Sequence, residues 1–454
     1  MNFRIPQKVN MIIEALMQQG YEAYVVGGCV RDMVLDREPE DWDITTSATP
    51  LEVKKIFRRT VDTGIEHGTV TVLIEKDHYE VTTYRLDGEY EDNRHPKEVS
   101  FTSSLTEDLK RRDFTINAMA YNETEGFIDL FGGMEDIQRK LIRCVGSAEE
   151  RFSEDALRIL RAVRFSAQLG FTIEAETLAA VRAKAANLSS ISAERIRVEL
   201  TKLLLSNHPD RLLDLYETGI TRIVLPEFDS LMITEHNNTH HIYSVGEHTL
   251  KTVEAVAGRQ ESSAFDVRER TILRWTMLLH DIEKPSCLSI GKDGQHHFHG
   301  HQEKGSSTAK RILRRLKFDN DTVDSVVHLI RWHDHRFELT PAGMRRTMSK
   351  IGKEYMPLLF EVYRADSSAK NPIYGEKKLA QLEEARLLYQ GVLDRGECVN
   401  LKEMNLNGKD LITMGMKPGR QIGEVLAYLL EEVLENPTLN VKDTLLNMAR
   451  ARTT

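Results

Sequence analysis

Two aspartates separated by one residue, Asp41 and Asp43, stand at the start of a short apolar run that follows a glycine pair, Gly27 and Gly28. Alternate residues of a strand point to one face, so the two carboxylates can share a divalent cation. A Gly-Gly turn before a helix lets phosphate oxygens approach backbone amides. These residue types in this order predict metal-assisted phosphoryl transfer, with an activated hydroxyl as nucleophile and pyrophosphate as leaving group. An Asp-x-Asp pair alone is more often solvated surface, so the prediction depends on the combination.

A second set of metal-ligand residue types lies in the middle of the chain, where twelve of the sixteen histidines fall between His236 and His335. Imidazole and carboxylate groups are the usual ligands of a catalytic divalent metal. A single such histidine is more often packed or on the surface, but a series of six residues of these types indicates a metal site. The six are His248, His280, Asp281, His301, His333 and Asp366.

The elements that must position these residues change in type along the chain. A helical stripe over residues 6–19 ends at Gly20, and short β-rich runs follow at 23–28, 42–46, 68–75, 79–85 and 127–133. From about residue 150 the apolar residues follow the helical period. We therefore expect an α+β chain with a small mixed sheet followed by helices, with domains at residues 1–145, 146–225, 226–390 and 391–454.

Composition narrows the class of protein. The 454 residues are 41% hydrophobic and carry a formal charge of −9, which excludes a uniformly basic coat for nucleic acid, although basic stripes at 161–164 and 310–317 could face phosphates. The four cysteines lack Cys-x-x-Cys spacing and so predict neither a zinc site nor a disulfide framework. No signal peptide or membrane-spanning run is recognisable, and we expect a cytoplasmic protein that does not bind a membrane.

The segment GGCVRD followed by DWD resembles the polymerase β-like nucleotidyltransferases, specifically their tRNA nucleotidyltransferase and poly(A) polymerase branch. The resemblance continues through RRDFTINAMAYN (111–122), DLFGG (129–133), EDALRILRAVRF (154–165) and AERIRVEL (193–200), in the order of that branch's later motifs. The chain thus resembles the bacterial class II CCA-adding enzymes. The resemblance implies a polymerase β-like nucleotidyltransferase head, an all-α neck that binds the nucleotide base and RNA, a body and a tail.

The resemblance also implies roles for single residues. It makes Asp41 and Asp43 ligands of Mg²⁺, with Glu80 as a third catalytic carboxylate, although an exposed edge glutamate is an equal alternative for Glu80. The residues implied to bind the nucleotide are Gly27, Gly28 and Arg31 for the triphosphate, Arg112, Asp113 and Asn117 for sugar and phosphate, and Arg161 and Arg164 on the next helix.

Asp155 and Arg158 are three residues apart and so lie on one face of a helix, where an ordinary salt bridge is the simplest interpretation. Cytosine and adenine, however, share an exocyclic amine beside a ring acceptor, and uracil and guanine present a carbonyl at the position of that amine. A carboxylate that accepts from the amine and an arginine that donates to the ring acceptor would admit C and A only. The resemblance implies this selecting role for Asp155 and Arg158.

The histidine-rich region resembles the HD-domain phosphohydrolases. By that resemblance His248, His280, Asp281 and Asp366 bind a first divalent metal of unknown identity, and His301 and His333 bind a second metal or a phosphate. Glu283 stands where many members have glycine, and it could alter the metal site or point away from it. Two interpretations stay open: hydrolysis of a phosphoester such as a 2′,3′-cyclic phosphate at an RNA end, or a vestigial domain that only extends the RNA-binding body.

Two further segments resemble parts of the CCA-adding enzymes. The polar segment 86–99 resembles the loop needed for the switch from C to A addition, and residues 406–440 resemble the tail that grips the tRNA elbow, with helix packing as the alternative. We expect an enzyme that adds C, C and A to the tRNA acceptor end from CTP and ATP. An A-adding enzyme, a poly(A) polymerase, and, in a different class, a phosphohydrolase of RNA ends are the alternatives, and the oligomeric state is open.

Overall fold

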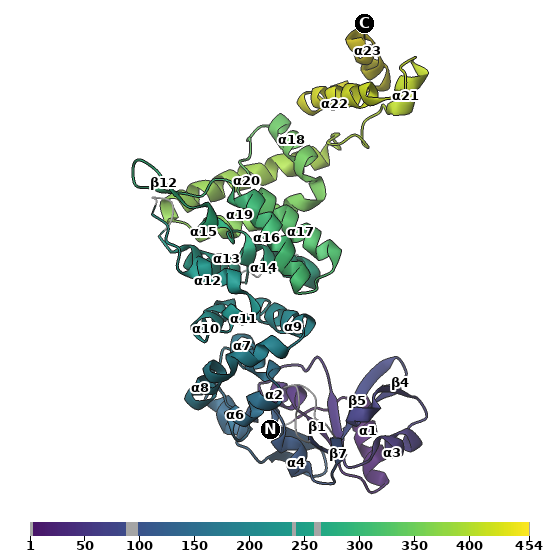
Figure 1. Cartoon of the computed structure of the whole chain (residues 1–454). Coiled ribbons are helices and arrows are strands. Elements are labelled where there is room, and N and C mark those ends of the chain that lie inside the picture. The colour runs from purple at the N-terminus through teal and green to yellow at the C-terminus, as the bar shows by residue number, and fades with distance from the viewer. Residues whose placement is uncertain (1–2, 88–98, 238–241, 258–264, 454) are drawn as a thin grey trace. The chain divides into compact units, whose positions relative to one another are not determined.

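The computed structural model describes residues 3–87, 99–237, 242–257 and 265–453 and divides the chain into two compact units, Met1–Asp229 and Ser230–Thr454 (Figure 1). Residues 88–98, most of the segment that resembles the C-to-A loop, lie outside the described residues, so that interpretation stays a prediction. Strands β6 (Arg85–Asp87) and β7 (Val99–Phe101), which flank that segment, pair antiparallel with each other. The finer division into four domains also stays a prediction.

The first unit is built on a seven-stranded mixed sheet with strand order β3-β4-β5-β2-β1-β8-β9. The β2–β5 pair is parallel and the other neighbouring pairs are antiparallel, so the predicted mixed sheet is confirmed. Sequence patterns missed β3, which is mostly exposed, and β8, which has only four residues. The strands are β1 (Ala23–Val26), β2 (Asp43–Thr46), β3 (Thr60–Gly64), β4 (Thr69–Ile74), β5 (Asp77–Thr83), β8 (Met119–Asn122) and β9 (Gly126–Asp129).

Burial along the central strands fixes where the functional side chains emerge. All four residues of β1 are buried, as expected of a strand flanked on both sides. In β2 only the first residue, Asp43, is exposed, and the Thr45 hydroxyl behind it donates a hydrogen bond of 3.1 Å to the buried carboxylate of Asp108. The exposed edge at the start of β2 therefore rests on a hydrogen-bonded and closely packed core.

Two glycines allow the close approaches around this edge. Gly27, at φ +83°, turns the chain from β1 into α2, a conformation that costs other residues free energy. A Cβ on Gly133, at the start of α5, would lie 2.3 Å from the Thr115 carbonyl oxygen, so α5 can pack against the 3₁₀ turn Thr115–Asn117 only with glycine there. The helices of this region are α1 (Gln7–Gln18), α2 (Gly28–Val34), α3 (Pro50–Ile56), α4 (Leu105–Lys110) and α5 (Gly133–Gln138).

The rest of the first unit is mainly helical. Leu157, Leu160, Val163 and Phe165 of α7 are buried in its core. One detail differs from the predicted all-α neck: β10 (Leu141–Ile142) pairs in parallel with β11 (Thr172–Ile173), because the chain after α7 is extended for two residues. The helices are α6 (Ala148–Glu154), α7 (Leu157–Leu169), α8 (Ala175–Lys184), α9 (Ala193–Leu204), α10 (Leu212–Glu217), α11 (Thr221–Val224) and α12 (Pro226–Met232), which crosses the unit boundary.

The second unit is helical apart from the short hairpin of β12 (Ser289–Ile290) and β13 (His296–His297). Its central helix α14 buries every residue from Ile272 to Leu279, including Trp275 at 0% exposure, and delivers His280 and Asp281 at its end. The other helices are α13 (Val245–Ala257), α14 (Val267–Leu279), α15 (Lys284–Cys287), α16 (His301–Arg315), α17 (Asn320–Trp332), α18 (Pro341–Ile351), α19 (Met356–Ser368) and α20 (Pro372–Asp394).

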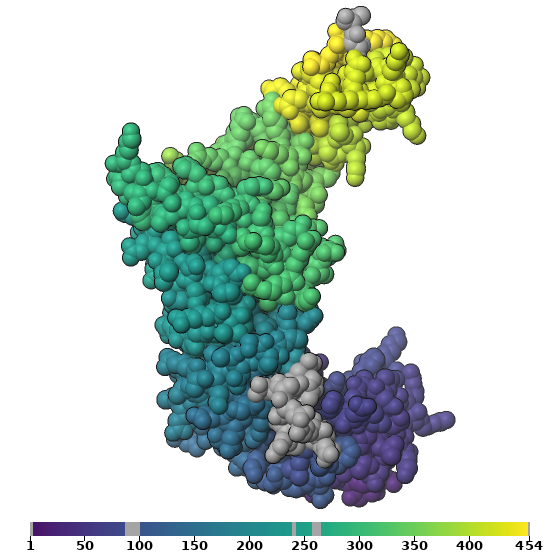
Figure 2. Space-filling model, viewed as in Figure 1, coloured from purple at the N-terminus to yellow at the C-terminus, as the bar shows by residue number. Residues whose placement is uncertain are grey.

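The C-terminal helices have a core of their own (yellow in Figure 2), with Leu411, Leu429, Val433 and Leu445 at its centre. Helix α20 continues unbroken past the expected boundary at residue 390. The helices after it are α21 (Gly408–Thr413), α22 (Arg420–Glu435) and α23 (Lys442–Thr453). Over the whole described part of the chain, none of the helices combines the length and the apolar character needed to cross a membrane.

Candidate functional site

Asp43 and Glu80 are register partners on the parallel strands β2 and β5, and both are exposed. Their neighbours in the register, Ile44 and Val81, are partners too but are buried, so the two carboxylates stand on the opposite face of the sheet from this apolar pair. Asp41 lies two residues before Asp43 and is also exposed. The structure thus brings together the three acidic residues that the sequence predicted.

The pKa values of two of these carboxyl groups reflect the crowding of charge. Partial loss of solvent raises the pKa of Asp43, the Arg112 guanidinium opposes this rise, and the charge of Asp41 adds to it. Partial loss of solvent, followed by repulsion from Asp43 and Asp41, also raises the pKa of Glu80. Carboxylates that repel one another across a short edge fit a divalent cation, whose charge would relieve the repulsion.

The glycine turn lies directly beside this acidic edge. A Cβ on Gly27 would lie 3.0 Å from Arg112 Nη1 and 3.9 Å from Asp43 Oδ2. Arg112 is held by Asp108 at 3.5 Å, and its Nε has no hydrogen-bond partner among the described residues. The turn, an arginine with an unused donor and the carboxylates therefore border the same space, which suits a triphosphate bound with its metal ions.

Arg31 and Asn117 belong to a chain of polar contacts that joins α2 to α7. Arg31 donates to Asp32 through Nε and Nη2 and to Asn117 Oδ1 through Nη1 at 2.9 Å, and Asn117 donates to Asp113 at 3.3 Å. Asp113 in turn accepts from Arg161 Nε at 2.7 Å. Burial would raise the pKa of Asp113, but Arg161 and Arg158 lower it to about 2, so this carboxylate is ionised. Asp113, expected at the sugar and phosphate, here orients Arg161 and Asn117.

Arg164 is placed differently from its neighbour Arg161. Its guanidinium lies 3.8 Å from the centre of the Phe165 ring and donates to Glu199 at 2.5 Å and Gln168 at 2.6 Å. Both ends of the Arg164–Glu199 ion pair are buried. The predicted contact of Arg164 with nucleotide stays a prediction, and in this structure its donors are used to join α7 to α9.

Asp155 and Arg158 have separate ion-pair partners among the described residues, so the simple salt bridge between them is not what the structure shows. Asp155 Oδ2 accepts from Arg195 Nη2 at 2.9 Å, while its Oδ1 accepts the Leu157 amide at 3.0 Å. Arg158 donates to Glu154 at 2.6 Å and to the Arg111 carbonyl at 2.9 Å. Arg195 was not predicted as a site residue, although it lies in the AERIRVEL motif that was recognised.

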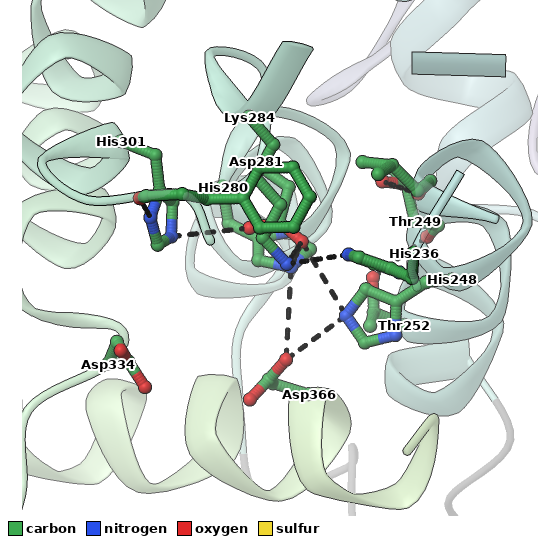
Figure 3. Close-up of polar contacts among 12 residues, drawn as sticks. His236, His248, Thr249, Thr252, His280, Asp281, Lys284, His301, Asp334 and Asp366 are labelled. Atoms are coloured by element: carbon green, nitrogen blue, oxygen red, sulfur yellow. Dashed lines mark hydrogen bonds and ion pairs between the residues drawn. The ribbon is translucent and has the colours of Figure 1, made fainter. Parts of the chain in front are cut away.

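The second centre gathers all six residues predicted for it, drawn from five helices or their ends. Figure 3 labels five of them, all except His333. Each of its four histidines has Nδ1 on a backbone carbonyl oxygen: His248 on Ala369 at 3.2 Å, His280 on Met277 at 2.8 Å, His301 on Phe298 at 2.7 Å and His333 on Ile330 at 2.7 Å. A carbonyl can only accept, so Nδ1 must carry the proton and Nε2 presents a lone pair to the centre.

Asp281 stands between two pairs of histidines. Its Oδ2 lies 3.1 Å from His280 Nε2 and 3.6 Å from His248 Nε2, and its Oδ1 lies 3.5 Å from His301 Nε2 and 3.8 Å from His333 Nε2. Oδ2 is also ion-paired with Lys284 Nζ at 2.8 Å, and both oxygens and His280 Nε2 are buried. Two groups of buried ligand atoms share this carboxylate and could each hold a metal ion: His248 and His280 with Asp281, and His301 and His333 with Asp281.

The charge states also suit metal binding. Burial lowers the pKa of His248 and of His301, and burial together with His280 and His301 lowers the pKa of His333 to about 3, so these rings are neutral near pH 7. Burial would raise the pKa of Asp281, but His280 and Lys284 hold it well below its usual range. Neutral imidazoles and ionised carboxylates are the ligand forms of these groups.

Glu283 does not join the centre. Its carboxylate accepts hydrogen bonds from Ser286 and, at 2.6 Å, from Thr308, and it lies 3.4 Å from Lys304 Nζ. Of the two interpretations of this residue, the structure supports the one in which it points away from the metal ligands. A cavity of about 300 Å³ opens at the centre, with Asp281, His301, His333, Asp366, Lys284 and Lys370 in its wall.

Three family models match parts of the chain. They are described as "Poly A polymerase head domain" over residues 23–143, "Probable RNA and SrmB- binding site of polymerase A" over 170–232 and "tRNA nucleotidyltransferase domain 2 putative" over 301–449. The first covers the acidic edge with its glycine turn, and the third begins at His301.

Curated relatives match over nearly the whole length. The CCA-adding enzyme of Lactiplantibacillus plantarum is 35% identical, covering 98% of this chain and 96% of that protein, and the one of Enterococcus faecalis is 34% identical, covering 97% and 94%. Among solved structures, the CCA-adding enzyme of Bacillus stearothermophilus in complex with CTP is 31% identical, with a TM-score of 0.75 over 98% of this chain and 97% of that one.

Proposed function

The chain belongs to the CCA-adding enzymes, and from this membership we propose that it adds C, C and A stepwise to the 3′ end of tRNA from CTP and ATP. In each step the terminal hydroxyl of the RNA attacks the α-phosphorus of the nucleotide. The bond from the α-phosphorus to the bridging oxygen breaks, pyrophosphate leaves, and the hydroxyl proton passes to solvent. The observation that carries this proposal is the acidic edge of Asp41, Asp43 and Glu80 beside the Gly27 turn.

In this proposal Asp41, Asp43 and Glu80 hold Mg²⁺, which when bound would acidify the attacking hydroxyl and neutralise the triphosphate. Arg112 and the turn at Gly27 and Gly28 receive the triphosphate. Arg31, fixed by Asp32 and Asn117, keeps its guanidinium at the same turn: a Cβ on Gly28 would lie 3.7 Å from its Nη2. The chain's own contribution is thus the positioning of phosphates over a preformed set of charges.

Asp155 and Arg158 select the base in this proposal. Asp155 Oδ2, held by Arg195, would accept a second hydrogen bond from the exocyclic amine of cytosine or adenine, while Arg158, anchored by Glu154 and the Arg111 carbonyl, donates to the ring acceptor. Uracil and guanine would leave the carboxylate facing a carbonyl oxygen, at a cost of about 1–3 kcal/mol for each unpaired group.

Single-nucleotide extension assays test the proposal. Three tRNA transcripts that end before CCA, after C and after CC are each incubated with magnesium and CTP, ATP or both. Completion of CCA from the shortest transcript is the expected result. Extension of only the CC-ending transcript would identify an A-adding enzyme, and unlimited addition of A would identify a poly(A) polymerase.

The second centre supports a second function, a metal-dependent phosphohydrolase that acts on RNA ends. The observation in its favour is the common orientation of four histidines, each with Nδ1 held by a backbone carbonyl and Nε2 within 3.8 Å of a carboxylate oxygen of the buried Asp281. His248, His280, Asp281 and Asp366 would bind one divalent metal, and His301 and His333 with Asp281 a second, which would acidify a water molecule and polarise the phosphate.

Hydrolysis of a 2′,3′-cyclic phosphate by this centre adds water to phosphorus and breaks one bond to ribose oxygen, which leaves as a hydroxyl with one of the water protons. The test measures metal content and hydrolysis of an RNA ending in a 2′,3′-cyclic phosphate, in the wild type and in Asp281→Asn. Asp43→Asn serves as the matched control, since it disables the first site and should leave hydrolysis intact. A wild type that binds metal but hydrolyses no phosphoester would support the vestigial alternative.

A further inference from the structure

A second cavity adjoins the cavity of the His/Asp centre. It has a volume of about 490 Å³, and three residues line both cavities: Asp334, Arg336 and Lys370. We call it the side groove, and its other lining residues include Phe337, Tyr363, Tyr374 and Lys378. The shared wall means that a ligand longer than one phosphate group could reach from the metal ligands into the side groove.

Asp366 connects the two cavities through its two oxygens. Its Oδ1 lies 3.1 Å from His248 Nε2, on the side of the metal ligands, and its Oδ2 is ion-paired with Lys370. Lys370 and the metal ligands thus contact different oxygens of Asp366. Asp366 Oδ1 could therefore bind a metal ion while Lys370 stays paired with Oδ2. The junction therefore holds an ion pair that fixes the orientation of Asp366.

A second ammonium group, that of Lys378 on α20, also lines the side groove. It lies 5.6 Å from the centre of the Tyr363 ring, and burial with the charge of Lys370 lowers the pKa of Lys378 to about 8. Lys370 is already ion-paired with Asp366, whereas Lys378 is a partly buried ammonium group that an anion in the side groove would stabilise. The exposed guanidinium of Arg336 adds a third positive charge, against the single exposed carboxylate of Asp334.

Aromatic side chains complete the wall of the side groove. Phe337 and Tyr363 pack against each other with ring centres 5.4 Å apart, and Tyr374 lies in the same wall. Basic groups interleaved with aromatic rings are the combination that binds single-stranded nucleic acid, with phosphates on the cations and bases on the rings. A volume of this size lies within the range of pockets that hold a small organic ligand, such as one nucleotide.

We propose that the side groove binds the penultimate nucleotide of an RNA strand, with its internucleotide phosphate at Lys378 and Arg336 and its base against Tyr374, while the 3′-terminal phosphoester lies at the His/Asp centre. This inference rests on the proposed phosphohydrolase and names its substrate class as an oligonucleotide end rather than a mononucleotide. Neither Lys378 nor Tyr374 belongs to the predicted metal ligands.

The test compares two ligands, a nucleoside 3′-phosphate and a fluorescent dinucleotide that carries a 3′-phosphate, with Kd measured on the manganese-loaded full chain. In the wild type we expect the dinucleotide to bind about tenfold more tightly, which corresponds to one stacked base. Lys378→Gln and Tyr374→Ala should each abolish most of this advantage and leave the mononucleotide Kd within about twofold. Lys377→Gln, an exposed lysine beside Lys378 on the same helix, is the control and should change neither Kd.

Arg336→Gln, at an exposed position, serves as a third variant if either of the others fails to fold. Equal Kd values for the two ligands in the wild type, or an unchanged dinucleotide advantage in the folded variants, would overturn the side-groove proposal. Equal weakening of both ligands by Lys378→Gln would overturn it as well, because the side groove would then hold the terminal nucleotide. A third outcome separates the two proposals. If the dinucleotide binds more tightly than the mononucleotide, the variants reduce this difference and no hydrolysis occurs, the phosphohydrolase is refuted and the side groove is supported.

Discussion

Asp43 and Glu80 face each other across the parallel strand pair β2–β5 as direct register partners, and the charge of Asp43 contributes to the raised pKa of Glu80. The two residues lie far apart in the sequence, and strand pairing alone brings their carboxylates to one edge. Each carboxylate lies near a like charge, so the ionised edge is less stable without a metal ion than with one bound.

The first prediction concerns the contribution of Glu80 to catalysis. Glu80→Gln removes one charge of the acidic edge without changing its size, and we expect nucleotide addition to fall about 10–100-fold, with a higher magnesium requirement. Extension rates of a CC-ending tRNA as a function of magnesium concentration would measure both effects. Glu75→Gln, an exposed glutamate at the turn after β4, is the control, and equal behaviour of the two variants would assign Glu80 to the solvated edge instead.

The second prediction concerns stability and pH. A carboxyl group whose pKa is raised in the folded state destabilises that state once it ionises, so Asp43 costs stability as pH rises above its ordinary pKa of 3.8. We expect Asp43→Asn to raise the Tm slightly at pH 7 in the absence of divalent metal and to leave it unchanged below pH 3.8, while nucleotide addition falls by about 100-fold. Thermal unfolding at both pH values, with a chelator present, measures the difference. A lower Tm at pH 7 would contradict the assigned repulsion.

The third prediction assigns Arg195 a positioning role. Arg195 Nη2 donates to Asp155 Oδ2, the oxygen proposed to receive the exocyclic amine of the base. Arg195→Ala should let Asp155 rotate, because it removes a hydrogen bond between charged groups that contributes about 1.5–3 kcal/mol. We expect kcat/KM for CTP and ATP to fall about tenfold. Incorporation of UTP relative to CTP should increase. Arg195→Lys should restore part of the selectivity. If Arg195 had a purely structural role, Arg195→Ala would lower kcat/KM equally for all four nucleotides. Lys202→Ala, at an exposed position on the same helix, is the control for changes to the helix itself.

Much of this site could be predicted from the sequence because its parts are local. The glycine turn, the Asp-x-Asp pair and the ordered His and Asp residues are visible as spacing, and the strands that carry Asp43 and Glu80 lie in runs rich in β-branched residues. Long-range pairing could not be predicted. The partner of Asp155 is Arg195, forty residues later on another helix, and nothing in either segment specifies that contact.

Side chains that look equivalent in the sequence can also differ in burial and in partners, because these depend on the packing of distant helices. Arg161 and Arg164 stand three apart on α7 and were expected to face phosphate together, but Arg164 is buried against Glu199 and Arg161 is partly exposed against Asp113. Likewise, Glu283 replaces a glycine beside the metal ligands, and its orientation toward Thr308 follows from the position of α16. In both cases the deciding contact comes from a helix that is distant in sequence.

The fourth prediction tests the buried pair Arg164–Glu199. Arg164→Ala leaves the Glu199 carboxylate buried without its cation, and we expect the free energy of unfolding to fall by about 3–5 kcal/mol. The double variant Arg164→Met with Glu199→Leu removes both charges and should recover most of that loss. Urea denaturation measures the difference, and KM for CTP in the double variant separates packing from nucleotide binding. An unchanged KM would leave Arg164 a structural residue, and a KM raised at wild-type stability would support its predicted contact with nucleotide.

The fifth prediction uses His333 in the second centre. Burial and the neighbouring His280 and His301 lower its pKa to about 3, so the folded protein keeps the ring neutral while the unfolded chain is protonated below about pH 6.5. This contribution to stability is complete above pH 6.5 and is lost as pH falls toward 3, by about 2 kcal/mol between pH 6.5 and pH 5. Urea unfolding with a chelator should therefore show a smaller loss of unfolding free energy in His333→Gln than in the wild type over that interval.

Added manganese should stabilise the wild type at pH 7 more than His333→Gln, because the lone pair of His333 Nε2 is available to a metal only while the ring is neutral. Identical pH slopes in the two proteins would contradict the neutral, buried state, and equal stabilisation by manganese would remove His333 from the ligand set.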